Sequence, residues 1–157
     1  MTRGPQRTVK RTDVLDKMTP GVIYTAGGIA DQFEASKDTV YHRLRELAEI
    51  DNIATKQTGG RARVWWTPLE QSIDASFIGE KSFRSDKDPK ILELLVEYGQ
   101  RGEPVTSGEL AAQLEEPQDS IYARLNRLQE QDLVKSGRVG GNSVVWWLFS
   151  ASMKVQT

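Results

Sequence analysis

The sequence contains no cysteine, which excludes disulfides and thiolate metal sites and is typical of a reducing cytoplasm. It also lacks any apolar run close to the ~20 residues of a membrane-spanning helix. Its start, MTRGPQRTVKRTD, lacks the apolar segment of a signal peptide. Charge of one sign is not in excess, because the net charge is −1 over 157 residues. These absences predict a cytoplasmic chain without a membrane partner and argue against a general nucleic-acid coat.

One stretch of the chain occurs twice. Residues 25–66 align without a gap on residues 106–147, at an offset of 81 positions. Identical pairs are spread over the whole length and include Thr25 with Thr106, Asp38 with Asp119, Tyr41 with Tyr122, Arg43 with Arg124, and Val64-Trp65-Trp66 with Val145-Trp146-Trp147. A match of this length indicates one supersecondary unit used twice. We therefore expect two small domains.

Charge is distributed unevenly along the chain. Residues 25–68 carry six basic and six acidic groups, whereas residues 88–149 carry six basic and ten acidic groups. This asymmetry indicates that the two copies do different jobs, although acidic residues that only keep the second copy soluble explain it equally well.

The first twelve residues contain four cations and almost nothing to bury: Arg3, Arg7, Lys10 and Arg11. This composition predicts a flexible basic arm. Such an arm can lie along phosphates or enter a minor groove. The alternative is an unstructured terminus without a function.

The first copy has the signals of a helix-turn-helix. Asp13 is suited to cap a short helix that ends at Pro20-Gly21, and residues 22–24 are extended. Apolar residues three and four apart predict a helix over residues 26–33. Ser36 is placed to cap a longer helix from Lys37 to about Ile50. Two short helices joined by a tight turn form a helix-turn-helix.

A hairpin follows. Strand-like residues 53–58 and 61–67 flank Gly59-Gly60, which suits both positions of a two-residue turn. The order of helix, short strand, helix, helix and hairpin is that of a winged helix, in which the hairpin is the wing.

The two faces of the hairpin differ in chemistry. Val64 and Trp66 are apolar in both copies, so we assign their face to the core. The other face carries Arg61, Arg63 and Trp65 and suits phosphates. In the second copy the matching face carries Asn142, Val144 and Trp146 and suits a protein surface.

The remaining elements follow the same reasoning. Leu69, Ile73 and Phe77 predict a short helix that runs into a linker, and Asp88-Pro89 predicts the cap and first turn of the next helix. We then expect helices over residues 107–114 and 118–131, and a hairpin over residues 133–149 that turns at Gly140-Gly141.

The predicted fold class is α+β, mainly α, with two tandem winged helix-turn-helix domains. The division is a basic arm (1–12), a first domain (13–68), a linker with a short helix (69–87), a second domain (88–150) and a tail (151–157).

The run SKDTVYHRLRELAE, followed by KQTGGRARVWW, resembles the winged helix-turn-helix regulators of halophilic archaea and their viruses. Their wings are rich in Gly and Arg and end in a Val-Trp-Trp type strand. The resemblance covers each repeat and implies sequence-specific binding of double-stranded DNA by a transcriptional regulator, usually a repressor. A tandem copy, and a second wing without Arg at the positions of Arg61 and Arg63, depart from the family pattern.

Candidate DNA contacts lie on the third helix and the wing of the first copy, since a recognition helix presents its N-terminal residues to the major groove. The helix supplies Lys37, Asp38, Thr39, Tyr41, His42 and Arg45, and the wing supplies Lys56, Arg61 and Arg63. Arg45 is the best candidate for pairing with guanine, and Lys37 and Tyr41 suit phosphates. Asp38 also suits the helix dipole.

The second copy offers a weaker set: Gln118, Ser120, Asn126, Arg127, Lys135 and Arg138. Glu115 and Glu116 stand just before this set and repel phosphate. We therefore expect the second copy to bind DNA weakly or to contact a protein.

The sequence favours a DNA-binding transcriptional regulator over two alternatives: a protein-protein adaptor, and a replication or partition factor of a plasmid or virus. One chain can cover two half-sites; the alternative is a homodimer through the Leu69–Phe77 helix or the outer Trp146 face. His42 is the single histidine and the glycine pairs lack the residues that complete a P-loop. We expect no enzyme activity, cofactor or metal.

Overall fold

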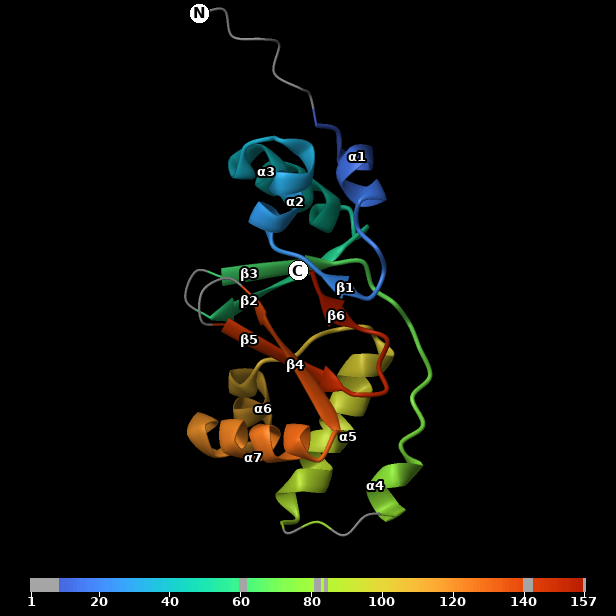
Figure 1. Cartoon of the computed structure of the whole chain (residues 1–157), viewed down its shortest axis with the longest axis vertical. Coiled ribbons are helices and arrows are strands. Elements are labelled where there is room, and N and C mark those ends of the chain that lie inside the picture. Colours follow the sequence, from blue (N-terminus) through green and yellow to red (C-terminus); the bar gives the residue numbers. More distant parts are fainter. Residues whose placement is uncertain (1–8, 60–61, 81–82, 84, 140–142, 157) are drawn as a thin grey trace, which may run out of the picture.

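The computed structural model describes residues 9–59, 62–80, 83, 85–139 and 143–156 (Figure 1). The first half consists of α1 (Arg11–Asp16), β1 (Val22–Ile23), α2 (Ala26–Phe33), α3 (Lys37–Glu49), β2 (Ala54–Gly59) and β3 (Ala62–Trp66). After α4 (Ser76–Glu80), the second half consists of α5 (Lys87–Gln100), α6 (Ser107–Leu114), α7 (Gln118–Glu130), β4 (Val134–Val139), β5 (Ser143–Leu148) and β6 (Lys154–Val155). The fold is mixed α/β, with more helix than strand.

Side-chain caps explain where α2 and α3 begin. The hydroxyl of Thr25 accepts a hydrogen bond from the backbone N–H of Gly28 at 3.1 Å, and that of Ser36 accepts one from Thr39 at 3.1 Å. Each cap satisfies a donor that the first helical turn leaves free. Both helices therefore begin where the sequence predicts.

The same backbone conformations recur 81 residues apart. α2 ends at Glu34 with a left-handed φ of 53°, and α6 ends at Glu115 with a φ of 55°. Asp51 and Asp132, which follow α3 and α7, both have a φ of 61°. Left-handed conformations are uncommon for residues other than glycine, so their pairing indicates that both halves turn the chain in the same way.

α1 begins earlier than predicted. It starts at Arg11, and Asp13 lies in its first turn, where Oδ2 accepts a hydrogen bond from the backbone N–H of Lys10 at 3.0 Å. Val9 is buried, and its carbonyl accepts a hydrogen bond from Nε of Arg43 at 2.9 Å. The last part of the predicted arm therefore belongs to the fold, because Val9 buries an apolar side chain and α3 supplies a donor.

The predicted helix over Leu69, Ile73 and Phe77 is mostly absent, since only α4 is helical in this region. Oδ1 of Asp74 accepts a hydrogen bond from the Ser76 N–H at 2.9 Å, just before α4. This bond favours the charged carboxylate and lowers the pKa of Asp74.

The segment before α4 crosses the end of α5 instead. The backbone N–H of Gln71 donates to the carbonyl of Gln100 at 3.0 Å. The backbone of Leu69 passes so close to Gly102 that a Cβ there would collide with it, and Gly102 has a φ of 68°. The homodimer through a Leu69–Phe77 helix therefore loses its basis, because this segment packs against its own chain.

α5 begins at Lys87, so Asp88 lies inside the helix and is not its cap. Asp88 is buried, and its Oδ1 lies 3.4 Å from Nη1 of Arg124 on α7. In the first half, Arg43 pairs with Glu46 at 2.8 Å. Asp88 thus pairs with an arginine of α7, and a cap assignment from sequence spacing cannot reveal this long-range contact.

The first hairpin pairs β2 with β3, and Gly59 lies opposite Ala62. Gly59 therefore belongs to the strand and not to the predicted two-residue turn. Residues 60–61 of this hairpin and residues 140–142 of the second one lie outside the described residues, and so does the predicted turn at Gly140-Gly141.

Both faces of the first hairpin pack against other elements, whereas the prediction assigned only the face of Val64 and Trp66 to the core. Trp65 is 1% exposed and lies in the core of the first half, where the ring of Tyr41 meets it edge-on at 5.5 Å. Val64 and Trp66 are buried as well, but in a cluster formed mainly by the second half. Alternation along a strand separates two faces; it does not say which neighbour covers each of them.

The second hairpin repeats this arrangement. Trp146 is 1% exposed, and Tyr122 meets it edge-on at 5.9 Å. The predicted protein-binding face is therefore a core face, with Val144 half-buried and Asn142 outside the described residues. A homodimer through an outer Trp146 face loses its basis for the same reason.

The predicted tail is part of the fold. β6 pairs in parallel with β1, with Val22 opposite Lys154 and Ile23 opposite Val155. Ala151 is also buried. The end of the chain thus returns to the first half and ties the two halves together.

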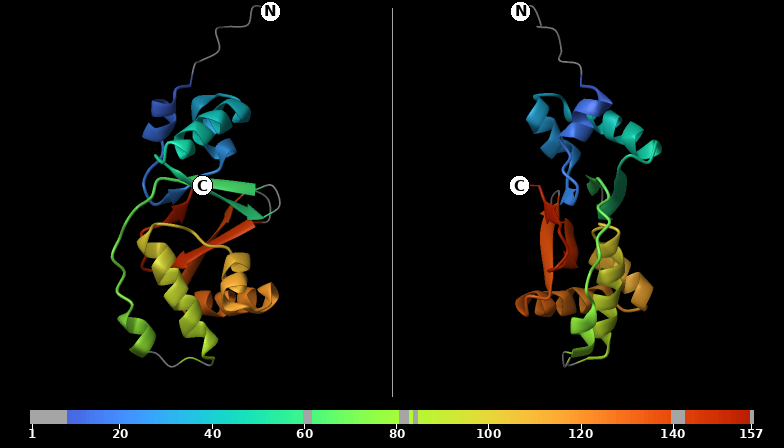
Figure 2. Two further views of the ribbon diagram at one scale, coloured as in Figure 1. Left: turned by 180° about the vertical axis from the view of Figure 1, so that it is seen from behind. Right: turned by 90° about the vertical axis from the view of Figure 1, so that its right-hand side faces the viewer.

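Both halves lie against each other through their hairpins. Figure 1 shows β2–β3 and β4–β5 in the middle of the molecule, with α1–α3 at one end and α4–α7 at the other, and the two views of Figure 2 agree. α3 and α7 therefore lie far apart, at opposite ends. None of the helices in the described ranges is long and apolar enough to cross a membrane.

Gly137 allows β6 to lie on β4. A Cβ at this position would collide with the side chain of Val155 and approach the ring of Trp147. We expect Gly137→Val to lower the free energy of unfolding by about 1–3 kcal/mol, since overpacking forces the strands apart. Urea denaturation measures this loss, and adding Val155→Ala should recover part of it. An unchanged midpoint would show that β6 does not pack on β4.

Candidate nucleic-acid interface

The first turns of α3 present polar side chains to solvent. Lys37, Asp38, His42 and Arg45 are all exposed, as predicted. Thr39 is half-buried, and its hydroxyl lies 2.8 Å from that of Ser36 in the helix cap. Thr39 is therefore engaged in the structure of the helix, while the other four side chains are available to a ligand.

Tyr41 has a structural role on the same helix. Its ring packs edge-on against Trp65 with an angle of 87° between the planes. The pair forms the floor of a groove between α3 and the wing, with a volume of about 490 Å³. The walls of the groove come from both elements: Arg45, Ala48 and Glu49 on α3, and Thr55 and Arg63 on the hairpin.

Arg45 and Arg63 are the two cations of this groove. Arg45 is exposed, and Nη1 of Arg63 donates a hydrogen bond to the hydroxyl of Thr55 at 3.2 Å, which orients its guanidinium. Two guanidinium groups beside an aromatic floor suit phosphate and base edges. The structure thus brings together one residue from the predicted recognition helix and one from the predicted wing.

Lys56 was predicted to contact DNA, and the structure contradicts this. Its Nζ lies 2.6 Å from Glu103 and 3.0 Å from Glu109, and it donates a hydrogen bond to the carbonyl of Pro104 at 2.7 Å. Only 13% of the side chain is exposed. The ammonium group of Lys56 is therefore bound by residues of the second half, because the face of β2 that carries Lys56 packs against that half.

Two aromatic rings complete the site of Lys56. Its Nζ lies 5.9 Å from the ring centre of Trp66 and 5.2 Å from that of Tyr98, which are cation–π distances. The cluster of Lys56, Glu103 and Glu109 is named here the junction cluster. It joins β2 of the first hairpin to α6 and to the segment just before α6.

The remaining cations that the sequence predicts to contact DNA in the first half are Arg61 and those of the basic arm. Arg3, Arg7 and Arg61 lie outside the described residues. Lys10 is exposed beside α1, and Nε of Arg11 lies 3.6 Å from a carboxylate oxygen of Glu46. Arg11 is thus partly neutralised by α3.

The candidate residues of the second half are less well placed. Nε2 of Gln118 donates to the hydroxyl of Ser107 at 3.2 Å, so this amide is used within the fold. Ser120 and Asn126 are half-buried, whereas Arg127, Lys135 and Arg138 are exposed.

The groove of the first half has no equivalent set of cations in the second. Asn126 occupies the position of Arg45, and Val144 that of Arg63. Across this region the hydroxyl of Ser136 donates to Oε1 of Gln129 at 3.1 Å. The second half therefore lacks the pair of arginines that makes the first groove suited to an anion.

Sequence reasoning missed two polar members of the first groove, Thr55 and Glu49. The packing of Tyr41 on Trp65 was missed as well, because Trp65 was assigned to the opposite face. The sequence did contain a signal for this contact. The Tyr and the Trp have the same spacing in both copies, which indicates the same contact within each unit.

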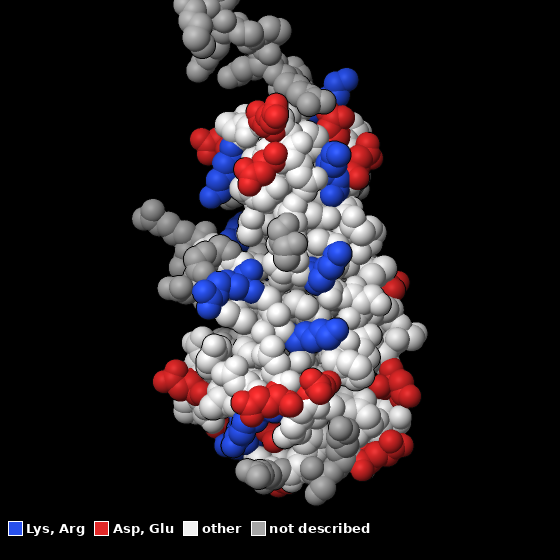
Figure 3. Space-filling model, viewed as in Figure 1, with Lys and Arg blue, Asp and Glu red and all other residues white. Residues whose placement is uncertain are grey.

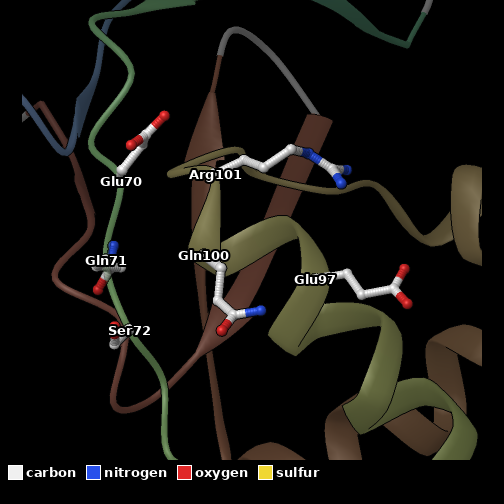
Figure 4. Close-up of a pocket in the computed structure, with 6 residues that line it drawn as sticks. All are labelled: Glu70, Gln71, Ser72, Glu97, Gln100 and Arg101. Atoms are coloured by element: carbon white, nitrogen blue, oxygen red, sulfur yellow. The ribbon is translucent and has the colours of Figure 1, made fainter.

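A second hollow of about 560 Å³ lies beside the segment that crosses α5. Glu70, Gln71, Glu97 and Arg101 are among its lining residues. Figure 4 shows that these side chains point in different directions and do not meet at one point. The described residues also contain no group of three His, Asp or Glu side chains that would hold a metal ion.

Comparisons with known proteins identify part of the fold. Residues 90–137 match the family described as a helix-turn-helix domain. No curated protein sequence matches the chain.

Similar solved structures include two mutants of Lactococcus lactis ZitR. One has 29% identity over 46% of this chain and 50% of its own, with a TM-score of 0.35. The other has 21% identity over 79% of this chain and 67% of its own, with a TM-score of 0.38. ScpB from Mycobacterium tuberculosis has 15% identity over 90% of this chain and 93% of its own, with a TM-score of 0.33. This chain spans half the length of the first ZitR structure.

The family match covers most of α5, all of α6 and α7, and the first part of β4. A hairpin completes this region, since β4 pairs with β5 in antiparallel register. The chain therefore contains a helix-turn-helix domain with the architecture of a winged helix.

Proposed function

We propose that the chain is a sequence-specific regulator of transcription that binds double-stranded DNA through two tandem winged helix-turn-helix units, and that it represses by occupying an operator. The groove between α3 and β3 carries this proposal, because it joins exposed Arg45 and oriented Arg63 above an aromatic floor. The helix-turn-helix match supports the second unit. The resemblance of both repeats to regulators of halophilic archaea and their viruses supports the same class.

In the proposed complex, α3 enters the major groove and its first turns face the base edges. Arg45 pairs with a guanine, and His42 and Asp38 lie on the same exposed side. Lys37 and Arg63 contact phosphates and set the register of the helix. The first unit is the principal reader, and the chain acts without a cofactor or enzyme activity.

A second candidate function rests on the second unit. Its groove lacks both arginines, and residues 88–149 carry four more acidic than basic groups. These features favour a unit that binds DNA weakly or contacts a protein, as in an adaptor or in a replication or partition factor. Selection of bound duplexes from a random pool, at low and moderate salt, separates the two functions, because an adaptor enriches no motif that survives added salt.

Replacing Arg45 with alanine is expected to cost about 1–3 kcal/mol at the preferred site and little on other sequences, since a bidentate contact to guanine carries sequence information. Replacing Arg63 should weaken binding to all duplexes alike and lower the salt dependence by about one unit, as expected for a phosphate contact. Titration of labelled duplexes with the selected and a scrambled sequence measures both effects.

Asn126→Ala is the matched control, because Asn126 occupies the position of Arg45 in the second unit. It should change affinity less than Arg45→Ala does. The opposite order would show that the second unit is the reader, and unchanged affinity in both arginine variants would refute the assignment of the first groove.

A further inference from the structure

Acidic residues are missing from two long stretches of the chain. None occurs from residue 52 to 69, and none occurs from residue 133 to the end at 157. The first stretch contains β2 and β3, and the second contains β4, β5 and β6. Since both hairpins lie in the middle of the molecule, the tertiary structure gathers the two acid-free stretches into one layer (Figure 1).

Figure 3 shows the result on one face of the molecule. Its middle, at the level of the hairpins and β6, shows Lys and Arg side chains and few acids, whereas the two ends show Asp and Glu together with Lys and Arg. The second half of the chain is acidic as a whole, but its strands carry cations and no acids, whereas its helices carry both.

The strands of the second half supply three cations to this layer: Lys135 and Arg138 on β4, and Lys154 on β6. All three are exposed, and none of them forms an ion pair within the described part of the chain. Other cations of the second half are neutralised, since Lys87 pairs with Glu116 and Arg124 with Asp88.

The three cations are held by rigid strands. The backbone N–H of Lys154 donates to the carbonyl of Gly21 at 3.0 Å, and Val155 packs against Gly137 of β4. β6 is thus fixed on one side by the first half and on the other by the second hairpin. Lys154, which lies far from Lys135 in the sequence, is placed on the neighbouring strand by this arrangement.

The chemistry of the face fits a polyanion. The large apolar side chains of β4, β5 and β6 are buried or half-buried, so the described part of this face lacks the exposed apolar centre of a protein interface. Unpaired cations on a fixed surface neutralise phosphates and release their counterions.

We propose that Lys135 of β4 and Lys154 of β6 form a second contact surface for the phosphate backbone of double-stranded DNA. The second unit then takes part in DNA binding through its strands and not through α7. This inference rests on the proposed function, and it explains how an acidic unit can lie on DNA.

The test neutralises two of the cations with Lys135→Gln and Lys154→Gln in the full chain. The matched control is the double variant Lys17→Gln and Lys90→Gln, which removes the same charge from exposed positions at the end of α1 and on α5. Each protein is titrated with labelled duplex at several salt concentrations. Each lost phosphate contact lowers the slope of log K against log[salt] by about 0.9, so the test variant should lose about two units of slope and bind about tenfold more weakly at low salt.

The control should retain the slope of the unmodified chain. Equal slopes in the two double variants would overturn the inference, and so would unchanged binding in the test variant. If the unmodified chain binds DNA and Arg45→Ala weakens it while the test variant binds normally, only this inference falls. If the unmodified chain does not bind DNA, the proposed function falls first.

Discussion

Replacing Trp66 with alanine is expected to lower the free energy of unfolding by about 3–5 kcal/mol, the usual loss for removing a buried tryptophan. Trp66 is 3% exposed and lies in a cluster with Ile91, Leu95 and Val105 of the second half. The substitution therefore opens a cavity between the two halves and not inside one of them. Urea denaturation followed by circular dichroism measures the loss.

Trp65→Ala is the control for the location of this effect, since Trp65 is equally buried but lies in the core of the first half. Both variants should lose stability. Only the Trp66 variant should also separate the halves, so that its unfolding broadens or splits into two transitions. A loss below about 1 kcal/mol for Trp66→Ala would contradict the packing of the first hairpin on the second half.

Lys56→Ala is expected to cost about 2–3 kcal/mol, because it leaves the carboxylate of Glu109 without its cation and that of Glu103 with only Arg101, at 3.6 Å. The loss is smaller than for a fully buried pair, since the side chains of Glu103 and Glu109 are 26% and 33% exposed. The variant also removes the contacts with Trp66 and Tyr98. The midpoint of urea denaturation measures the change.

A triple variant separates charge from packing in this cluster. Lys56→Met keeps a long apolar side chain against the aromatic rings, and Glu103→Gln with Glu109→Gln removes the unpaired charges. This variant should recover most of the stability, because a buried ionic cluster contributes little beyond an apolar one of equal volume. The change Glu109→Gln is not expected to harm α6, since an amide oxygen can accept the hydrogen bond from the Thr106 N–H that the carboxylate accepts at 3.0 Å. No recovery would mean that the ion pairs themselves stabilise the junction.

The junction also bears on the proposed function. Buried Trp66, the junction cluster and the pairing of β6 with β1 hold the two halves together at three places. α3 and α7 consequently keep a fixed separation. On the proposed function, the preferred DNA sites of the two units should therefore tolerate little change in spacing.

Local elements of the fold were predictable. The helix over residues 26–33 and the one over residues 107–114 agree with α2 and α6 at both ends, and α3 ends one residue before the predicted limit. These elements are specified by nearby residues: a hydroxyl cap, apolar residues at helical spacing and a turn. The exposed positions of Lys37, His42 and Arg45 follow from the same periodicity.

The errors have one physical cause. Lys56, Asp88 and the C-terminal residues 151–157 were misassigned because their partners lie far away in the sequence. From the sequence, the position of Lys56 on a wing predicts a phosphate contact. Only the fold brings Glu103 and Glu109 to it. From the sequence, the short C-terminal stretch predicts a tail. Only the fold places it beside β1, with which β6 pairs.

By itself, the sequence determined the repeated unit, the bounds of its helices and the acid-free composition of both hairpins, since each depends on residues within one turn or one strand of each other. Only the tertiary structure decided which face of each hairpin meets a partner, which cations are neutralised and which remain exposed. Lys56 and Lys135 show the difference, because both lie on the first strand of a wing, yet one is enclosed by the other half and the other faces solvent. Burial and charge pairing depend on which surfaces meet, and that follows from the packing of the two halves.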